Sequence, residues 1–232
     1  ENKIVTQNAV FFQRSNPNVD SPALDITKVN FSNSFADRIS NADTLREHMR
    51  SMMPVATQLE AIFIKSQLET APLDVLKQFF LNFWMTRNEI NPEKAWEDYK
   101  FEVKKVNAAY STQVKKGYNT DMGRVYLQYG PPNTVTDVPF DVSSIDGNPS
   151  VPYQIWHYYS LNNNRERNRK FVFIASELRA KDYTLAHSDA SGEIQNYNWQ
   201  NQLVRQLGVG DTDRDVMRQD RGRSATYYNN PY

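Results

Sequence analysis

The sequence predicts an α+β fold, in which a helical N-terminal half packs on a C-terminal antiparallel sheet of three to five strands. Apolar residues recur at intervals of three and four from about residue 41 to residue 116, and alternation with a period of two becomes common after that. Helices that come first and strands that follow are typical of α+β rather than α/β proteins. The chain has 232 residues, of which 12% are aromatic, and this is enough to build a sizeable core.

The composition of residues 1–40 predicts an extended or irregular segment that precedes the domain. Short apolar groups are interrupted there by Pro17, Pro22 and several asparagines, which favour loops over regular elements.

The first two helices follow directly. Thr44-Leu45-Arg46-Glu47 is a capping-box pattern that predicts a helix start, and Pro54 should end or kink this helix. A second helix is expected from about Val55. Its predicted buried residues are Leu59, Ile62 and Phe63.

A third helix is predicted after Pro72, and the fourth has the clearest pattern. Asn91 is a good N-cap and Pro92 suits the first helical position. The spacing predicts a helix from about Pro92 to Lys116, ended by Gly117 in a left-handed cap. Its predicted packing seam consists of Trp96, Tyr99, Val103, Val106 and Tyr110.

The remaining elements are predicted mainly as strands. Residues 124–129 alternate and predict a strand that ends in a turn at 130–133, and residues 134–152 predict a long loop. Three further strands, 153–159, 170–174 and 183–187, predict an antiparallel meander. A last helix is expected at 196–207, which would close a domain of residues 41–207, and 208–232 predict an irregular tail.

Composition excludes some classes of protein and disfavours others. The 27 basic and 27 acidic residues balance, so we expect no nucleic-acid partner. The absence of cysteine excludes disulfides, thiolate metal sites and cysteine nucleophiles. No apolar run approaches the roughly 18 residues of a membrane span. The chain does not begin with Met, so we expect the native start to lie upstream, removed with an export signal or by trimming.

The stretch from Gly117 to Asn133 uses three of the eight glycines in the chain. Gly117-Tyr118-Asn119-Thr120-Asp121 resembles the signature of the GWxTD family, with Tyr in place of Trp. The resemblance continues through Gly123-Arg124 and Gly130-Pro131-Pro132-Asn133 to the strand that contains Trp156, and covers about residues 75–205. The resemblance implies an exported bacterial protein, and the family has no established activity. The matching motif residues are Gly117, Tyr118, Thr120, Asp121, Gly123, Arg124, Gly130, Pro132 and Trp156.

Two interpretations apply to the motif itself. Asp121 and Arg124 are close enough to pair with each other or to orient a substrate. Alternatively, Thr120 and Asp121 cap a turn or short helix while Arg124 anchors the loop to the sheet. We favour the structural interpretation, because turn chemistry accounts for every residue of the motif.

No complete catalytic or metal-binding set is recognisable. His157 and His187 could face each other across a sheet, but no Asp or Glu accompanies them at metal-ligand spacing. His187 is followed by Ser188-Asp189, yet adjacent side chains on a strand point in opposite directions and cannot form a triad unaided. We therefore predict no catalytic residue, no cofactor and no metal.

Aromatic residues provide the candidate contact surface. We assign to it Tyr126, Tyr129, Tyr158 and His187. The predicted function is a non-enzymatic interaction or assembly module of the cell envelope, located in the periplasm or at the outer membrane. Its expected partner is another envelope protein or a second copy. The alternative is a hydrolase or carbohydrate-binding protein that uses a cleft between the helices and the sheet.

Overall fold

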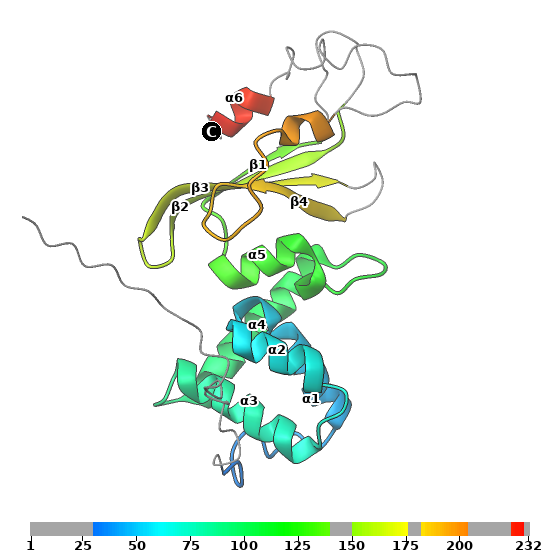
Figure 1. The fold of residues 1–232 in the computed structure, drawn as a ribbon, viewed down its shortest axis with the longest axis vertical. Helices are drawn as coiled ribbons and strands as arrows, with labels where there is room; N and C mark the ends of the chain where they lie inside the picture. The colour runs from blue at the N-terminus through cyan, green and yellow to red at the C-terminus, as the bar shows by residue number, and fades with distance from the viewer. Residues whose placement is uncertain (1–29, 140–149, 176–181, 204–223, 230–232) are drawn as a thin grey trace, which may run out of the picture.

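The computed structural model describes residues 30–139, 150–175, 182–203 and 224–229. Figure 1 shows the helices of the N-terminal half below a four-stranded sheet, which confirms the predicted α+β class. The boundary between the two halves lies at α5 (Asp121–Tyr129), which packs under the sheet.

The N-terminal half contains α1 (Ala42–Ser51), the 3-10 helix η2 (Met53–Val55), α2 (Gln58–Gln67), α3 (Leu73–Arg87) and α4 (Pro92–Tyr110). The predicted capping box at Thr44–Glu47 is wrong, because α1 begins earlier and is capped by the side chain of Asn41. The capping box of this region belongs to α2, where Thr57 and Glu60 exchange side-chain and backbone hydrogen bonds.

The helical core is rich in aromatic side chains. Phe80, Trp84 and Trp96 are almost completely buried, and the ring of Trp96 lies 5.0 Å from Phe80 and 5.5 Å from Trp84. The predicted inner face of α2 is wrong, since Leu59 and Ile62 are exposed. Glu60 faces inward instead, because its carboxylate caps α2 and pairs at 2.8 Å with Arg87 of α3.

The fourth helix is shorter than predicted. α4 ends at Tyr110, and a turn follows in which Thr112 donates its N–H to the carbonyl of Lys115 at 2.9 Å. Gly117 is therefore not a left-handed cap; it opens the 3-10 helix η3 (Gly117–Asn119). The strand predicted at 124–129 is also wrong, because these residues belong to α5, which begins at the N-cap Thr120.

The C-terminal half contains the predicted antiparallel meander, in the order β1-β2-β3-β4. β2 (Tyr153–Leu161), β3 (Glu166–Ala175) and β4 (Tyr183–Ser188) correspond to the three predicted strands. β1 (Thr134–Val138) lies in the segment predicted as a loop and pairs Val135 with Trp156 of β2.

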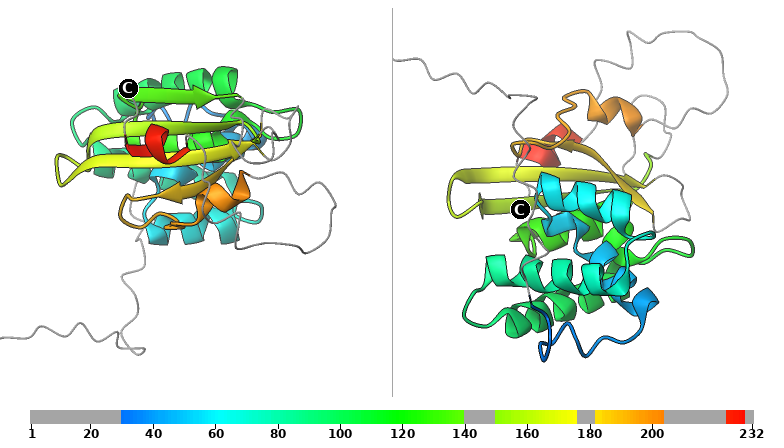
Figure 2. Two further views of the ribbon diagram at one scale, coloured as in Figure 1. Left: turned by 90° about the horizontal axis from the view of Figure 1, so that it is seen from above. Right: turned by 60° about the horizontal axis from the view of Figure 1, so that its bottom comes forward.

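The two faces of the sheet pack against different elements (Figures 1 and 2). The inner face contacts Met122 and Val125 of α5. The outer face contacts the 3-10 helix η4 (Trp199–Gln202) and α6 (Ser224–Asn229). Within the described residues the helix predicted at 196–207 is only this short 3-10 turn, and α6 is an unpredicted helix within 208–232.

The inner-face core side chains on the strands are Trp156, Tyr158, Leu161, Phe171, Phe173 and Leu185. The corresponding outer-face side chains are Val138, Tyr153, Ile155, Val172, Ile174 and Ala186.

Candidate functional site

The predicted motif forms a junction between α4, α5 and β4, which we call the junction and define as residues 117–124. Two of its glycines allow backbone to touch backbone. A Cβ atom added to Gly117 would lie 2.3 Å from the carbonyl oxygen of Val106 in α4. A Cβ added to Gly123 would lie 1.9 Å from the carbonyl oxygen of Gly117. Glycine is therefore needed at both positions for close approach rather than for a left-handed conformation.

Side chains of α4 and its C-terminal turn hold the start of the junction. Gly117 donates its N–H to Ser111 Oγ at 2.9 Å, and Tyr118 donates its N–H to Asn107 Oδ1 at 3.2 Å. Thr120 Oγ1 donates to the carbonyl of Gly117 at 2.7 Å and accepts from the N–H of Gly123 at 3.1 Å. Thr120 thus caps α5 and ties it to η3, which confirms the predicted capping role.

Tyr118, the residue that replaces the Trp of the signature, points back into the helical half. It is 4% exposed, and its hydroxyl donates to Glu47 of α1 at 2.9 Å. Burial, together with the hydrogen bond to this carboxylate, raises the pKa of Tyr118 above its ordinary value. Burial alone would raise the pKa of Glu47, but hydrogen bonds from Lys116 and Tyr118 outweigh it and the pKa is lowered.

Asp121 and Arg124 connect the junction to the sheet instead of pairing with each other. Asp121 Oδ2 accepts the backbone N–H of Leu185 in β4 at 2.8 Å. Arg124 forms two hydrogen bonds of 2.8 Å to the carboxylate of Glu193, which follows β4. Tyr129 also donates to Glu193, at 2.9 Å.

The opposite charges of Arg124 and Glu193 compensate each other. The side chain of Glu193 is only 6% exposed, so the bidentate guanidinium is what keeps a carboxylate stable there. Burial alone would lower the pKa of Arg124, but the hydrogen bonds to Glu193 outweigh it and the pKa is raised. Arg124 therefore anchors α5 to the segment after β4, in the manner that the structural interpretation predicts.

The remaining motif residues, Gly130, Pro132 and Trp156, lie in the turn after α5 or in the core of the sheet. Gly130 ends α5 with φ of +83° and donates its N–H to the carbonyl of Tyr126 at 2.8 Å. Pro132 is partly buried in the link from α5 to β1. Trp156 is buried on the inner face, where its ring lies 4.8 Å from Phe173 and 5.6 Å from Tyr110.

The four residues of the candidate contact surface are buried or partly buried in this structure. Tyr158 and His187 are 2% and 1% exposed, on opposite faces of the sheet. Tyr126 and Tyr129 are partly buried on α5, and their hydroxyls donate to Glu102 and Glu193. These four residues therefore pack the sheet against its helices, and the prediction that they form one exposed patch is wrong.

The histidines do not meet either. His157 lies on β2 and His187 on β4, with β3 between them. His157 hydrogen-bonds to Asn168, whereas His187 contacts Asn196 and Tyr228. Among the residues that the structure describes, no group of three or more His, Cys, Asp or Glu side chains could hold a metal ion.

Ser188 and Asp189 are engaged with the backbone of β3. Ser188 Oγ donates to the carbonyl of Lys170 at 2.9 Å, and Asp189 Oδ1 accepts the N–H of the same residue at 2.6 Å. With His187 bound elsewhere, these side chains do not form the hydrogen-bonded relay of a hydrolase.

A comparison with known protein families matches most of the chain. The GWxTD domain family matches residues 25–203, which is more than half of the chain. The chain belongs to the GWxTD domain family. No curated protein and no solved structure gave a match. In the described portion of the chain, no helix has both the length and the apolar character to cross a membrane.

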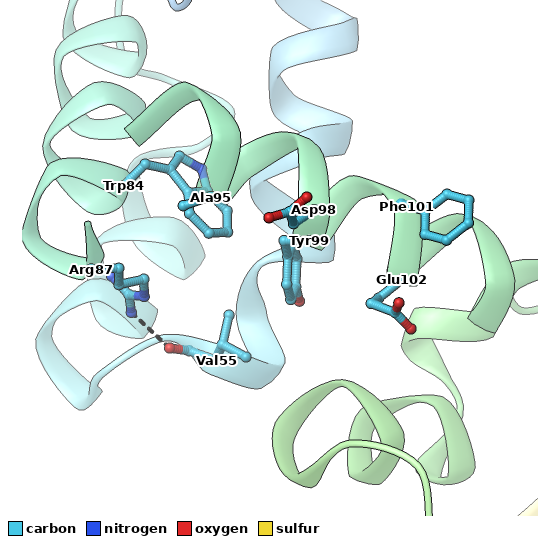
Figure 3. Close-up of a pocket in the computed structure, with 8 residues that line it drawn as sticks. All are labelled: Val55, Trp84, Arg87, Ala95, Asp98, Tyr99, Phe101 and Glu102. Carbon is cyan, nitrogen blue, oxygen red and sulfur yellow. Dashed lines mark hydrogen bonds between the residues drawn. The ribbon is translucent and has the colours of Figure 1, made fainter. Parts of the chain in front are cut away.

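A groove of this GWxTD domain has no counterpart among the sequence predictions. It lies between η2, α3 and α4, with a volume of about 600 Å³ (Figure 3). The groove is lined by Val55, Trp84, Arg87, Ala95, Asp98, Tyr99, Phe101 and Glu102. The signal that could have found it is Phe101, a large apolar residue that lies off the packing seam of α4 and is 57% exposed.

The charged groups that line this groove already have partners. Arg87 is bound to Glu60 and to the carbonyl of Val55, the latter contact drawn in Figure 3. Asp98 pairs with Lys94 at 3.3 Å, and Glu102 pairs with Lys105 at 2.7 Å. The groove therefore offers mainly apolar side chains.

A second, polar pocket of about 560 Å³ lies between α5 and the turn that joins β2 to β3. Its lining consists of Gln128, Tyr129, Ser160, Leu161, Asn162, Asn163 and Asn164. The three asparagines have φ of +52°, +56° and +66°, a left-handed conformation that Asn tolerates better than most residues. No lining side chain carries a charge.

Proposed function

We propose that this GWxTD domain is a non-enzymatic interaction module of the bacterial cell envelope, in the periplasm or at the outer membrane. It binds an apolar segment of a partner protein in the groove between η2, α3 and α4. The envelope address is an expectation from the family resemblance, and the binding mode is supported by the groove.

One observation supports binding over catalysis. The polar side chains of the family motif are engaged in internal hydrogen bonds, and the charged residues of the groove are paired with neighbours. Catalytic acids, bases and nucleophiles have to face a substrate. The exposed ring of Phe101, at one end of a groove that Trp84 and Tyr99 also line (Figure 3), instead suits the apolar anchor of a bound protein segment.

The test is an envelope crosslinking pull-down with mass spectrometry, comparing wild type with Phe101→Glu. The matched control is Ile194→Glu, because Ile194 is 59% exposed and lies outside the groove. We expect Phe101→Glu to lose a partner protein that both wild type and the control retain. Capture of the same partners by Phe101→Glu would reject the groove as the binding site.

The location in the cell envelope is tested by a separate experiment. Fractionation of the native bacterium with an antibody to this protein should recover it with the periplasm or the outer membrane. Recovery in the cytoplasmic fraction would contradict the envelope assignment without affecting the groove.

A second candidate function is carbohydrate binding, favoured by the uncharged, amide-rich pocket that contains Tyr129. Amide groups and an aromatic side chain suit the hydroxyls and ring faces of sugars. Isothermal titration with N-acetylglucosamine oligosaccharides tests it, with Asn163→Gly as the variant that removes an amide and keeps the left-handed backbone. Heat of binding that Asn163→Gly abolishes would favour this function; no heat with wild type would reject it.

A further inference from the structure

The outer face of the sheet contains a socket that holds one tyrosine side chain, which we call the Tyr228 socket. Tyr228 belongs to α6, which lies above the sheet in Figure 1. Its ring lies 5.6 Å from His187 of β4 and 5.9 Å from Trp199 of η4. The ammonium of Lys170 in β3 lies 4.7 Å from the ring centre, within the range of a cation–π interaction.

The socket also recognises the hydroxyl group of the tyrosine. His187 Nδ1 accepts the N–H of Asn196 at 3.0 Å, so the proton of the neutral imidazole lies on Nε2. Nε2 then donates to Tyr228 Oη at 3.0 Å, and this hydroxyl donates to Asp189 Oδ2 at 3.4 Å. Burial lowers the pKa of His187, which maintains the neutral form that this chain of donors requires.

Phenylalanine would fill the same space but remove two hydrogen bonds of the socket. The His187 Nε2–H would lose its acceptor, and Asp189 would lose a donor. Because His187 is buried, an N–H group left without an acceptor is costly there, so the socket selects tyrosine over phenylalanine.

The segment that provides Tyr228 depends on the socket for its order. α6 has six residues, far fewer than an isolated helix needs to be stable in water. Besides Tyr228, Tyr227 packs against the outer-face core, and Ser224 is 1% exposed. These contacts hold α6 on the sheet.

The sequence allows the same contacts to form between two molecules. Twenty residues, 204–223, separate the described end of η4 from α6. At roughly 3.3–3.6 Å per residue such a tether can span up to about 70 Å, more than the diameter expected of a domain of this size. For a segment joined to its site by a connection of this length, the effective concentration is on the order of 1 mM.

We propose that the Tyr228 socket is a tyrosine-recognition site that exchanges partners, taking Tyr228 of a second copy of this chain when the copies are concentrated. Each copy carries both the socket and the segment, so exchange preserves every contact and produces a reciprocal dimer. This self-association uses the outer face of the sheet and does not depend on the groove between α3 and α4.

A peptide experiment tests the socket. The probe is a fluorescent synthetic peptide with the sequence of residues 219–232, and the receptor is the full chain with Tyr228→Ala, whose socket is vacant. We expect saturable binding by fluorescence anisotropy, and at least about tenfold weaker binding to wild type, where α6 competes from the same chain. A peptide with Tyr228→Phe should bind about tenfold more weakly than the natural peptide, since one buried hydrogen-bond chain is lost.

Two outcomes of this titration would overturn the site. One is no binding of the natural peptide at 1 mM, on the order of the effective concentration of the tethered segment, to a Tyr228→Ala chain with an unchanged circular dichroism spectrum. The other is equal affinity for the Tyr and Phe peptides.

Exchange between copies is tested by sedimentation of the wild-type chain. We expect reversible dimerisation as the concentration approaches the order of 1 mM, and its loss in Tyr228→Ala. The Phe101→Glu chain should dimerise like wild type, so this result does not depend on whether the groove binds a partner. A wild-type chain that stays monomeric over this range, or a Tyr228→Ala chain that dimerises equally, would reject the exchange.

Discussion

The junction and the groove between α3 and α4 use their side chains in opposite ways. In the junction, Thr120, Asp121 and Arg124 are each bound to another element or to the backbone, and glycines bring main chains into contact. In the groove, apolar surface is exposed at Phe101 while the charged neighbours pair on its rim.

This difference separates the residues that define the family from those proposed to act. The family signature specifies how the helical half is attached to the sheet. Because Thr120, Asp121 and Arg124 are already hydrogen-bonded within the domain, binding should be sought on the surfaces that the junction holds in place. Substitutions in the junction should therefore change stability, and substitutions in the groove should change partner capture.

The largest expected effect is that of Gly123→Ala. The new Cβ would lie 1.9 Å from the carbonyl oxygen of Gly117 and 2.8 Å from Val106 Cγ1. The backbone of η3 or α5 would have to move to relieve this overlap. We expect a loss of more than about 4 kcal/mol in the free energy of unfolding, or no folded protein. Chemical denaturation measures it. The matched control is Gly130→Ala, where φ is +83° but nothing lies within 4 Å of the added Cβ, so the loss should be about 1–2 kcal/mol. Equal losses in both variants would contradict the close-contact role of Gly123.

Asp121→Ala should have the next largest effect. It leaves the N–H of Leu185 without its acceptor and removes a negative charge from the first turn of α5. We expect a loss of about 1–3 kcal/mol by thermal or chemical denaturation. Asp121→Asn keeps an acceptor oxygen and should lose less than half as much. An unchanged melting temperature together with lost partner capture would instead assign Asp121 to a functional site.

Acidification should weaken the helical half through His48. Burial, followed by the charge of Lys100, lowers the pKa of this histidine to about 4, from 6.5 for the ordinary side chain. Above pH 6.5 neither the folded nor the unfolded chain binds the proton, so His48 does not change the free energy of unfolding there. Between pH 6.5 and 4 the unfolded chain binds the proton and the folded chain does not, so stability falls as the pH falls.

Solvent screening of this partly buried ring limits the loss to about 1–2 kcal/mol. Denaturation at pH 7.5 and pH 5 measures it, with His48→Leu as the comparison. His187, whose pKa is also lowered by burial, accounts for a residual dependence in that variant. An identical pH dependence in wild type and His48→Leu would contradict the role of His48.

The smallest expected effect on stability is that of Phe101→Glu. Phe101 is 57% exposed, and the ammonium of Lys105 lies 4.5 Å from the centre of its ring. The free energy of unfolding should change by no more than about 0.5 kcal/mol. A larger loss would mean that Phe101 supports the fold, and would remove the contrast between groove and junction.

The helical half was largely predictable because its periodicity is strong. Trp96, Val103 and Val106 lie on the buried side of α4, as their spacing predicts, and Asn91 caps the helix. The inner face of α2 was not predictable from apolar spacing. Two of the three predicted core residues are exposed there, and a buried Glu60 depends on Arg87, which is distant in sequence.

The error at α5 has an identifiable cause. Val125-Tyr126-Leu127 favours strands by propensity, and its alternation competes with the helical spacing of Met122, Val125, Tyr126 and Tyr129. The N-cap Thr120 and the left-handed Gly130 mark both ends of the helix. β1 was missed because several prolines and a glycine follow it, although residues 134–138 alternate.

The site was predictable only in part. Local signals were enough to assign Thr120 as a cap and Arg124 as an anchor. The partners Leu185 and Glu193 lie more than 60 positions away, and no local pattern indicates them. The groove is formed by η2, α3 and α4 packing together, so its shape follows from tertiary structure alone.

The hydrogen bond between Leu185 and Asp121 makes one amide proton an indicator of how firmly the two halves are attached. Exchange with solvent at Leu185 should slow only while α5 is in place, because the acceptor comes from the helix. The amide of Ile155, in the inner strand β2 with regular pairing on both sides, is the reference that the sheet itself protects. The protection of the Leu185 amide relative to its intrinsic exchange rate would therefore give the free energy of detaching the halves, without any substitution in the chain.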